Sequence, residues 1–443
     1  MDERAPAPPR LVSIDLLRAF AILWVVLFHL WGDLEYFPGV PRVYYEQLWF
    51  QVEEGRGPRA VLTSLTDLFL RKGFQGVPLF MMISGLSLTI AAYRAGDGLR
   101  WPRFMTARFR KLLVPYVAGV VLTYGVLLAI AWRVSATNGM PFEDAVGHGT
   151  TISERTFLQI DGGVIFASLA LVPRLFRDEW FFAPQLALWF VGLLAQYYLL
   201  FPLLFLVMRR IGVVAFLLAT FAVTVAANGW AVHEYAALEL KFFLVTGWAP
   251  FRLFEFTAGM ALGWLLIDPR ARVWLERVRH PAVLCVSAAA GLAAMVAGDL
   301  LIGWWTFDQI IARDTVLYWQ ALGLPLVTLG LALVFLPLLV RRPSRVDVTL
   351  PVRAAVTLGV MSYAVLIVND AMRLVASQLR VEDVSAAAWW TFLVAVYVPA
   401  SVAIAWPLAR VLGLLPATRR AERKPRGEAP RPALEPVDVP VRI

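Results

Sequence analysis

Residues Leu11 to Leu30 have the sequence LVSIDLLRAFAILWVVLFHL, and this stretch decides the fold class. About 20 mostly apolar residues form a helix long enough to cross the hydrocarbon core of a bilayer. The stretch therefore predicts a first membrane-spanning helix. It also contains three ionisable residues, Asp15, Arg18 and His29. Such residues are costly inside a membrane, which makes all three candidates for function.

Arg18 and His29 are eleven positions apart. At roughly 100° per residue this separation is about three turns, so both side chains project from one face of the helix, about 16 Å apart along its axis. One stripe is thus expected to carry a fixed cation near the start of the helix and a titratable imidazole deeper in the membrane. The alternative is that Asp15 and Arg18 are snorkelling groups at the interface and that His29 is a packed polar residue.

The composition indicates a polytopic membrane protein. Of 443 residues, 59% are hydrophobic and 16% are charged, whereas about 25% are charged in soluble domains. The net charge of +9 comes from short basic runs between apolar segments, which is the pattern of the positive-inside rule and does not indicate nucleic-acid binding. The single cysteine cannot form an internal disulfide, and no metal motif, P-loop or dinucleotide fingerprint occurs.

Ten apolar segments are long enough, or nearly so, to span the bilayer. They lie at about residues 11–30, 76–92, 113–132, 186–207, 211–227, 250–267, 281–302, 317–340, 354–374 and 388–412. Basic residues concentrate between alternate segments, so we expect an all-α protein of about ten transmembrane helices with both termini in the cytoplasm. The first span lacks a cleavage site and should remain in place.

The remaining segments complete the expected organisation. We predict a cytoplasmic head at 1–10, one transmembrane domain at 11–416, and a disordered, basic and Pro-rich cytoplasmic tail at 417–443. Residues from about 32 to 74 are expected to form a loop. The apolar stretch at 162–175 is too short for an ordinary span and is expected to be re-entrant or interfacial.

Four further motifs place polar residues at or within spans. Ser84 interrupts the apolar stretch 73–88, where small residues can serve helix packing or admit a ligand. The basic run at 101–116 either sets topology or clamps phosphates. Arg252 and Glu255, three positions apart, can neutralise each other or bind a hydroxylated ligand. The fourth motif is the late span at 358–373, which carries the polar residues Ser362, Tyr363, Asn369, Asp370 and Arg373.

Taken together, these stretches resemble the membrane-bound acyltransferase-3 family, polytopic O-acyltransferases that modify cell-surface or secreted molecules. The resemblance is carried by Arg18 and His29 with Asp15 before them, by GVPLFMMISGL (Gly76, Val77, Phe80, Ser84, Gly85), by the basic run before Pro115 and Tyr116, by RLFEFTAGM, and by LWFVGLLAQYYLLFPLL. Two departures stand out. Leu194 and Ala195 lie where many members have acidic residues, and Asn369 lies where many have His.

The resemblance implies transfer of an acyl group from cytosolic acyl-CoA, with acetyl-CoA as the first candidate donor, to a hydroxyl of a carbohydrate or another cell-surface or secreted acceptor. His29 is expected to act as general base, with Asp15 and Arg18 as its catalytic companions. The residues expected to bind the donor are Arg18, Ser84, Arg108, Arg110 and Lys111. Those expected to bind the acceptor are Arg252, Glu255, Tyr363 and Asn369.

The expected partners are the lipid bilayer of the plasma membrane, acyl-CoA, the hydroxylated acceptor and a second copy of the chain, with no metal. Two alternatives stay open on the sequence. Ten helices with a few charges inside the membrane also suit a transporter or flippase of a glycan or small molecule. A scaffold without catalysis is the other alternative, because Leu194, Ala195 and Asn369 depart from the family pattern.

Overall fold

The chain was analysed as a computed structural model, which describes residues 12–34, 57–96, 99–148, 169, 171, 188–234, 245–268, 271–303, 313–340, 349–379 and 384–415. Within these residues the regular structure is helical, with no strand. Ten helical segments are long and apolar enough to cross a membrane, which confirms an all-α, multi-pass integral membrane protein. The predicted head, the tail and nearly all of 162–175 lie outside the described residues.

The spans follow one another in chain order, some of them built from more than one helical element. They are α1 (Val12–Leu34), α3, η1 and α4 (Pro58–Arg71, Lys72–Gln75 and Gly76–Ala95), α5 (Trp101–Asn138), α9 (Trp189–Ile211), α10 (Val213–Glu234), η4 and α12 (Ala249–Arg252 and Leu253–Ile267), α14 (Pro281–Gly303), α15 (Arg313–Val340), α16 (Leu350–Ser377), and α17, η6 and α18 (Ala386–Phe392, Leu393–Tyr397 and Val398–Val411). Two short helices, α6 (Phe142–His148) and α13 (Arg272–Val278), lie between spans.

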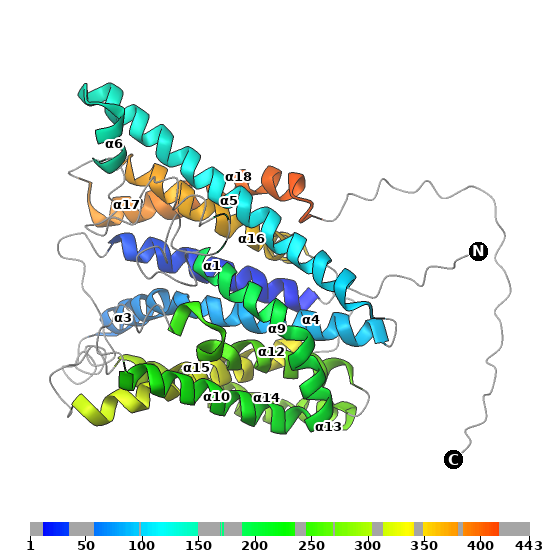
Figure 1. Cartoon of the computed structure of the whole chain (residues 1–443). Coiled ribbons are helices and arrows are strands. Elements are labelled where there is room, and N and C mark those ends of the chain that lie inside the picture. The colour runs from blue at the N-terminus through cyan, green and yellow to red at the C-terminus, as the bar shows by residue number, and fades with distance from the viewer. Residues whose placement is uncertain are drawn as a thin grey trace, which may run out of the picture.

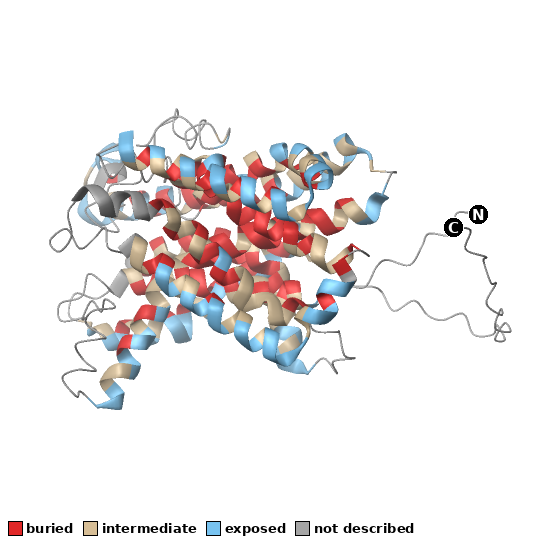
Figure 2. Cartoon of the chain, turned by 90° about the horizontal axis from the view of Figure 1, so that it is seen from below, coloured by how far each residue is buried: buried red, intermediate tan, exposed pale blue. Residues whose placement is uncertain are grey.

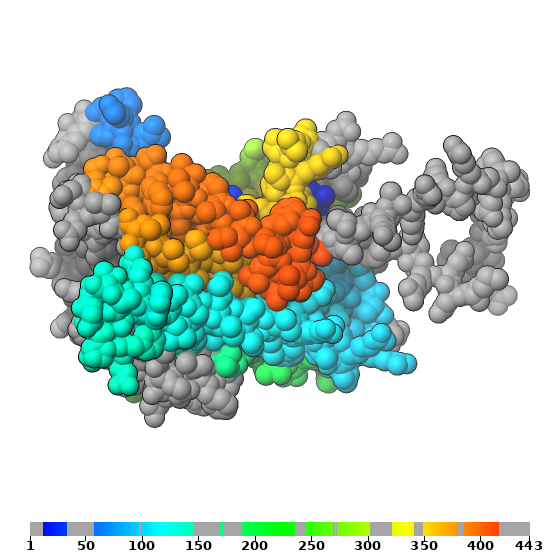
Figure 3. Space-filling view, turned by 90° about the horizontal axis from the view of Figure 1, so that it is seen from above, coloured from blue at the N-terminus to red at the C-terminus, as the bar shows by residue number. Residues whose placement is uncertain are grey.

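The first helix, α1, lies in the middle of the bundle, between α16 on one side and α4 on the other (Figure 1). One group of helices, α5, α16 and α18, packs together on the α16 side, and Figure 3 shows this face with α5 beside α16 and α18. The other group contains α10, α12, α14 and α15. Buried residues concentrate in the middle of the bundle, and exposed ones lie toward its outside and its ends (Figure 2). The ionisable residues of α1 are therefore held at the centre of the protein.

Glycines let the central helices approach closely. A Cβ added to Gly359 of α16 would collide with the backbone carbonyl of Asp15 in α1, and one added to Gly259 of α12 would collide with the backbone of Met82 in α4. Small residues at such crossings bring backbones together, which is how helices associate in a membrane, where packing replaces the hydrophobic effect. The contact at Gly359 brings α16 close to α1, and the contact at Gly259 brings α12 close to α4.

The ends of the spans alternate between the two ends of the bundle. The starts of α1 and α5, the end of α18 and the short helix α13 lie at one end, and α3, α6 and α17 lie at the other (Figure 1). The first end is therefore also the one that carries the basic run at the start of α5. This is the arrangement that the positive-inside rule requires if that end faces the cytoplasm; the orientation itself stays a prediction.

The expected loop at 32–74 was wrong over residues 58–71, which form the helix α3 and continue through η1 into α4. Pro58 opens α3 at a position where its missing N–H costs nothing. Its sequence, PRAVLTSLTDLFLR, mixes polar and apolar residues and so lacks the long apolar run that indicates a span, and only Ser64 and Leu68 of this helix are buried. The indole of Trp24 donates to the Phe69 carbonyl at 2.7 Å, which ties α3 to α1.

The last span contains a π-helical turn, η6, between α17 and α18. A π turn holds one more residue than an α turn, and such turns occur often at functional sites. The turn ends at Tyr397, whose side chain is 3% exposed and faces α16. Tyr397 thereby reaches the group of polar residues described next.

Candidate active site

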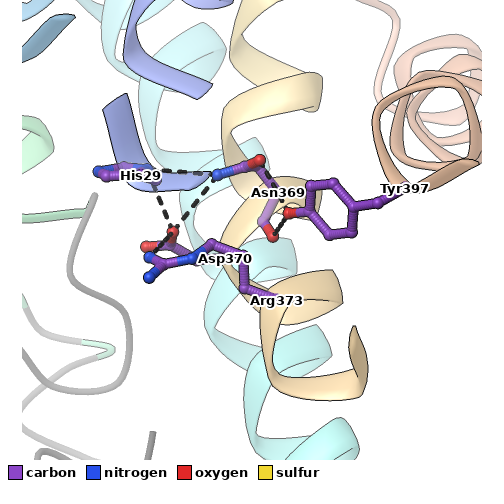
Figure 4. A network of polar contacts seen from close by, with 5 residues as sticks. All are labelled: His29, Asn369, Asp370, Arg373 and Tyr397. Carbon is purple, nitrogen blue, oxygen red and sulfur yellow. Dashed lines mark hydrogen bonds and ion pairs between the residues drawn. The ribbon is translucent and has the colours of Figure 1, made fainter. Parts of the chain in front are cut away.

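The His29 side chain, on α1, lies against two polar residues of α16 and is only 7% exposed. Its Nδ1 atom is 3.5 Å from Oδ1 of Asp370 and 3.3 Å from Nδ2 of Asn369. Figure 4 shows this end of the ring turned toward α16 and the other end pointing away from both residues. One ring nitrogen therefore contacts Asp370 and Asn369, and the other lies on the opposite side of the ring.

The two α16 residues are themselves held in place. The hydroxyl of Tyr397 donates to Oδ1 of Asn369 at 2.9 Å and also to the Asn369 backbone carbonyl. Arg373 lies one turn further along α16, with Nη1 3.5 Å from Oδ1 of Asp370 (Figure 4). Because the Tyr397 bond fixes the Asn369 oxygen, the amide nitrogen faces His29. The network thus joins α1, α16 and η6 into one polar unit.

The two neighbours of Nδ1 favour different tautomers of His29. The Asp370 carboxylate accepts a proton carried on Nδ1, whereas the Asn369 amide donates to a bare Nδ1. A charged acceptor makes the stronger hydrogen bond, and a carboxylate beside imidazole also stabilises its protonated form. The arrangement therefore favours the tautomer in which Nε2 is the proton acceptor.

A small cavity adjoins His29. It is lined by residues of α1, α4, α9 and α16, namely Val25, His29, Val77, Phe80, Trp189, Phe190 and Leu366. His29 is the single titratable residue among these seven. A reacting group in the cavity would meet one imidazole and an otherwise apolar wall.

Arg18 lies on the same helix as His29 but contacts α4. Its Nη1 atom is 3.3 Å from Oδ1 of Asp15, and its Nη2 atom donates to Oγ of Ser87 at 3.2 Å. The Asp15 side chain is buried, while 33% of the Arg18 side chain is exposed. The expected pairing of these two residues is present, and it leaves part of the guanidinium accessible.

A stripe along α4 connects the surroundings of Arg18 with those of His29. Val77, Phe80, Ser84 and Ser87 are each partly exposed, whereas the residues between them, such as Gly85, are buried. Val77 and Phe80 line the cavity at His29, and Ser87 binds Arg18. Ser84 lies between these two points, so the expected donor-binding serine belongs to the same stripe.

The three basic residues expected at the start of α5 differ in their surroundings. The charges of Arg108 and Arg18 both act on the hydroxyl of Tyr198 in α9, so both arginines lie within electrostatic range of the same side chain. Arg110 and Lys111 are exposed on α5. The structure thus brings Arg108 toward the Arg18 end of the stripe and leaves the other two at the surface.

The buried pair expected to bind the acceptor is neutralised internally. Nε and Nη2 of Arg252 each lie 2.8 Å from Oε1 of Glu255, and the two side chains are 5% and 2% exposed. The Arg252 guanidinium also lies 5.2 Å from the centre of the Trp189 ring, which lines the cavity. The pair therefore supports the cavity wall from behind, and Glu255 pairs with Arg252 rather than with Arg18.

Tyr363 occupies a similar position behind Phe190. Its hydroxyl donates to the Leu112 carbonyl at 2.9 Å, and its ring centre is 6.4 Å from that of Phe190. Among the residues that the structure describes, none of Arg252, Glu255 and Tyr363 lines the cavity itself. Of the four residues expected at the acceptor, Asn369 is the one that contacts His29.

Several residues of this site had no role assigned from the sequence. Asp370 and Arg373 belong to a motif noted for its polarity, but their approach to His29 depends on how α1 and α16 pack. Tyr397 lies in an apolar stretch, and nothing in its local sequence marks it. Ser87 lies three positions after Ser84 and therefore on the same face of α4, and this spacing is the one sequence signal that could have identified it. In the described part of the chain no cluster of His, Cys, Asp and Glu could hold a metal.

Comparison with known proteins assigns the family. A family model described as "Acyltransferase domain", that of the acyltransferase-3 family, matches residues 11–410. This range is nearly the whole chain and contains every residue of the site described above. No curated protein and no solved structure matches the chain. The chain therefore belongs to the acyltransferase-3 family and is a multi-pass membrane acyltransferase.

Proposed function

We propose that this protein transfers an acyl group, acetyl in the first place, from cytosolic acyl-CoA to a hydroxyl of a carbohydrate or another acceptor at the cell surface. The observation that carries the proposal is the placement of His29. One of its nitrogens is beside the Asp370 carboxylate, and its ring lines a cavity inside a membrane acyltransferase. An imidazole oriented by a carboxylate is a common general base for acyl transfer.

The chemical step needs one base and two substrates. Nε2 of His29 takes the proton from the acceptor hydroxyl as its oxygen attacks the thioester carbonyl carbon. The C–O bond forms and the C–S bond breaks, and the thiolate of CoA leaves. The imidazolium, stabilised by Asp370, then returns the proton to that thiolate. The products are the acyl ester and free CoA, and His29 regains its starting form.

The donor is proposed to enter at the Arg18 end of the α4 stripe. Arg18 is partly exposed, and Arg108 and Arg18 lie within electrostatic range of the same Tyr198 hydroxyl. Guanidinium groups bind phosphates in a bidentate manner, so these two arginines are suited to the phosphates of CoA, with Arg110 and Lys111 attracting the anion at the surface. Ser84 would then lie along the path from the phosphates to the thioester.

The acceptor is proposed to approach His29 from the opposite end of the bundle. His29 lies in the later part of α1, and Asp370 lies in the later part of α16. Both helices run from the predicted cytoplasmic end toward the other side. Asn369 is proposed to contact the acceptor, whereas Arg252, Glu255 and Tyr363, which the sequence predicted at the acceptor, are proposed to support the wall of the neighbouring cavity through Trp189 and Phe190. The acyl group would thus cross the plasma membrane without the whole donor crossing it.

The test uses purified full-length protein in nanodiscs with acetyl-CoA labelled on the acetyl group. We expect slow release or transfer of acetyl by the native chain, and a loss of about a hundredfold or more in His29→Gln, because general bases contribute about that much. His233→Gln, at the exposed end of α10, is the matched control and should retain full activity.

Two results would contradict the proposal. One is a native chain that neither binds nor consumes any acyl-CoA, and the other is a His29→Gln variant with native turnover. Movement of a labelled glycan across the membrane without any acylated product would favour the transporter alternative.

A further inference from the structure

The cavity beside His29 is narrow and apolar. Its volume is about 20 Å³, and six of its seven lining residues are apolar. A space of roughly 10–15 Å³ holds one water molecule, so this cavity has room for a group not much larger than a methyl. A whole sugar placed there would lose the hydrogen bonds of its several hydroxyls to water, and His29 is the one polar side chain in the lining that could replace any of them. The lining thus suits a short hydrocarbon chain better than a polar acceptor.

Aromatic rings set the size of the cavity. Phe80 of α4 and Phe190 of α9 are stacked across it, with ring centres 6.4 Å apart and planes inclined at 27°. Tyr363 packs edge-on against Phe190 from behind at 6.4 Å. Trp189 is covered by the guanidinium of Arg252, whose charge Glu255 neutralises. Two of the walls, Trp189 and Phe190, are therefore supported by side chains that lie outside the cavity.

The cavity lies where the acyl end of a donor would arrive. Val77 and Phe80, which line it, are the last members of the α4 stripe that begins at Ser87 and Arg18. The opposite boundary is His29 itself. A thioester whose phosphates are at the arginines and whose carbonyl is at the imidazole would place its acyl chain among these apolar residues.

We propose that this cavity is the acyl-binding pocket and that Phe80, stacked on Phe190, limits the donor to short acyl groups. The proposal rests on the proposed function and deepens it, since it names the structural feature that selects the acyl chain. Arg252, Glu255 and Tyr363 then act as positioning residues that hold Trp189 and Phe190. Selectivity of this kind is typically about tenfold to two-hundredfold for each methylene that does not fit.

The experiment compares acetyl-, butyryl- and hexanoyl-CoA as donors for the full-length chain in nanodiscs. The native protein should prefer acetyl over butyryl by at least about tenfold in kcat/KM. Phe80→Ala should raise the butyryl-to-acetyl ratio of kcat/KM by about tenfold or more, because it removes the ring that limits the length of the pocket. Phe221→Ala, which removes a partly buried ring packed on Phe254 of the other helix group, is the matched control and should leave the ratio unchanged.

A second variant changes the pocket in the opposite direction. Val77→Phe fills the cavity, so acetyl transfer should fall by at least about tenfold. Its binding of free CoA should match that of the native protein, because CoA has no acyl chain and its phosphates are held elsewhere. If Phe80→Ala cannot be obtained folded, Phe80→Leu and Val77→Ala enlarge the pocket more gently and serve the same test.

The results separate this inference from the function on which it rests. The native chain could transfer acyl groups while neither Phe80→Ala nor Phe80→Leu changes the butyryl-to-acetyl ratio of kcat/KM. That result would contradict the assignment of the acyl-binding pocket and leave the acyltransferase proposal standing. A native preference for hexanoyl over acetyl also overturns the pocket alone. A native chain that consumes no thioester of any length overturns both.

Discussion

Nδ1 of His29 and Oδ1 of Asp370 lie 3.5 Å apart, between the first and the ninth membrane spans. Both side chains are almost fully buried, at 7% and 6% exposure. A lone charge at such a position would carry a large desolvation penalty, which a partner of opposite charge offsets. The Asp370 carboxylate lies between His29 and Arg373, so a proton gained by His29 would be next to an oxygen that can accept a hydrogen bond from it.

The first prediction concerns this carboxylate. Asp370→Asn keeps the shape of the side chain but removes the charge that stabilises a protonated His29, so kcat for acyl transfer should fall by about a hundredfold to a thousandfold with little change in KM for acyl-CoA. Steady-state kinetics in nanodiscs measures both constants. Asp268→Asn removes another buried carboxylate, one bonded to Tyr93, and should leave kcat within about twofold.

The second prediction concerns Arg18. A lysine in its place keeps the positive charge but lacks the fork that reaches Asp15 and Ser87 together. Arg18→Lys should therefore raise KM for acyl-CoA by about tenfold, and Arg18→Ala by more. Arg209→Ala, an exposed arginine in the last turn of α9, is the control. Equal KM values for the native chain and both Arg18 variants would show that Arg18 does not bind the donor.

The third prediction concerns the support of Asn369. Tyr397→Phe removes the hydroxyl that donates to this residue and leaves two buried oxygens without that donor, which costs about 1–3 kcal/mol of stability. Asn369 would then be free to turn, and kcat should fall by about tenfold to a hundredfold. Tyr93→Phe loses a hydrogen bond at the other end of the bundle and should affect stability without affecting kcat.

The fourth prediction concerns the crossing of α1 and α16. Gly359→Ala places a methyl group against the carbonyl of Asp15, so the helices must separate, at a cost of about 1–3 kcal/mol. Gly125→Ala, in α5, meets no atom within 4 Å and should be neutral or stabilising by up to about 1 kcal/mol. Thermal unfolding in detergent compares the two variants. A Gly359→Ala protein as stable as Gly125→Ala would contradict the close packing.

The fifth prediction concerns orientation. Asn138 at the end of α5 and Arg210 at the end of α9 are both exposed, and the positive-inside rule assigns them to opposite sides of the membrane. In a Cys285→Ala background, a membrane-impermeant maleimide applied to intact cells should label Asn138→Cys and not Arg210→Cys. Labelling of Arg210→Cys alone would reverse the topology.

Much of the fold could be predicted from the sequence because the membrane imposes one strong rule. A spanning helix needs a long apolar run, so the ten runs gave ten spans. The rule fails for a helix such as α3, which is amphipathic and too polar to resemble a span. Its existence depends on contacts such as that of Trp24 with Phe69, which join elements 45 positions apart.

The site could be predicted only where its members share a helix. Asp15 and Arg18 are three positions apart, as are Arg252 and Glu255, and helix geometry alone brings each pair together. His29 and Asn369 are 340 positions apart, and their contact requires α1 to lie against α16. No local pattern carries that information, which is why Asp370 and Tyr397 were assigned no role from the sequence.

Because of the π turn at Leu393–Tyr397, the polar network around His29 depends on the number of residues in the last span as well as on their side chains. Deleting one residue from this turn would restore ordinary α-helical winding, since a π turn differs from an α turn by that single residue. Because the π turn already accommodates one extra residue, the helices on either side would keep their relative orientation, and the change would be confined to the side chains of the turn itself. A chain shortened by one residue there would keep its hydropathy and its ten spans, yet Tyr397, at the end of the turn, would lose the position from which its hydroxyl reaches Asn369.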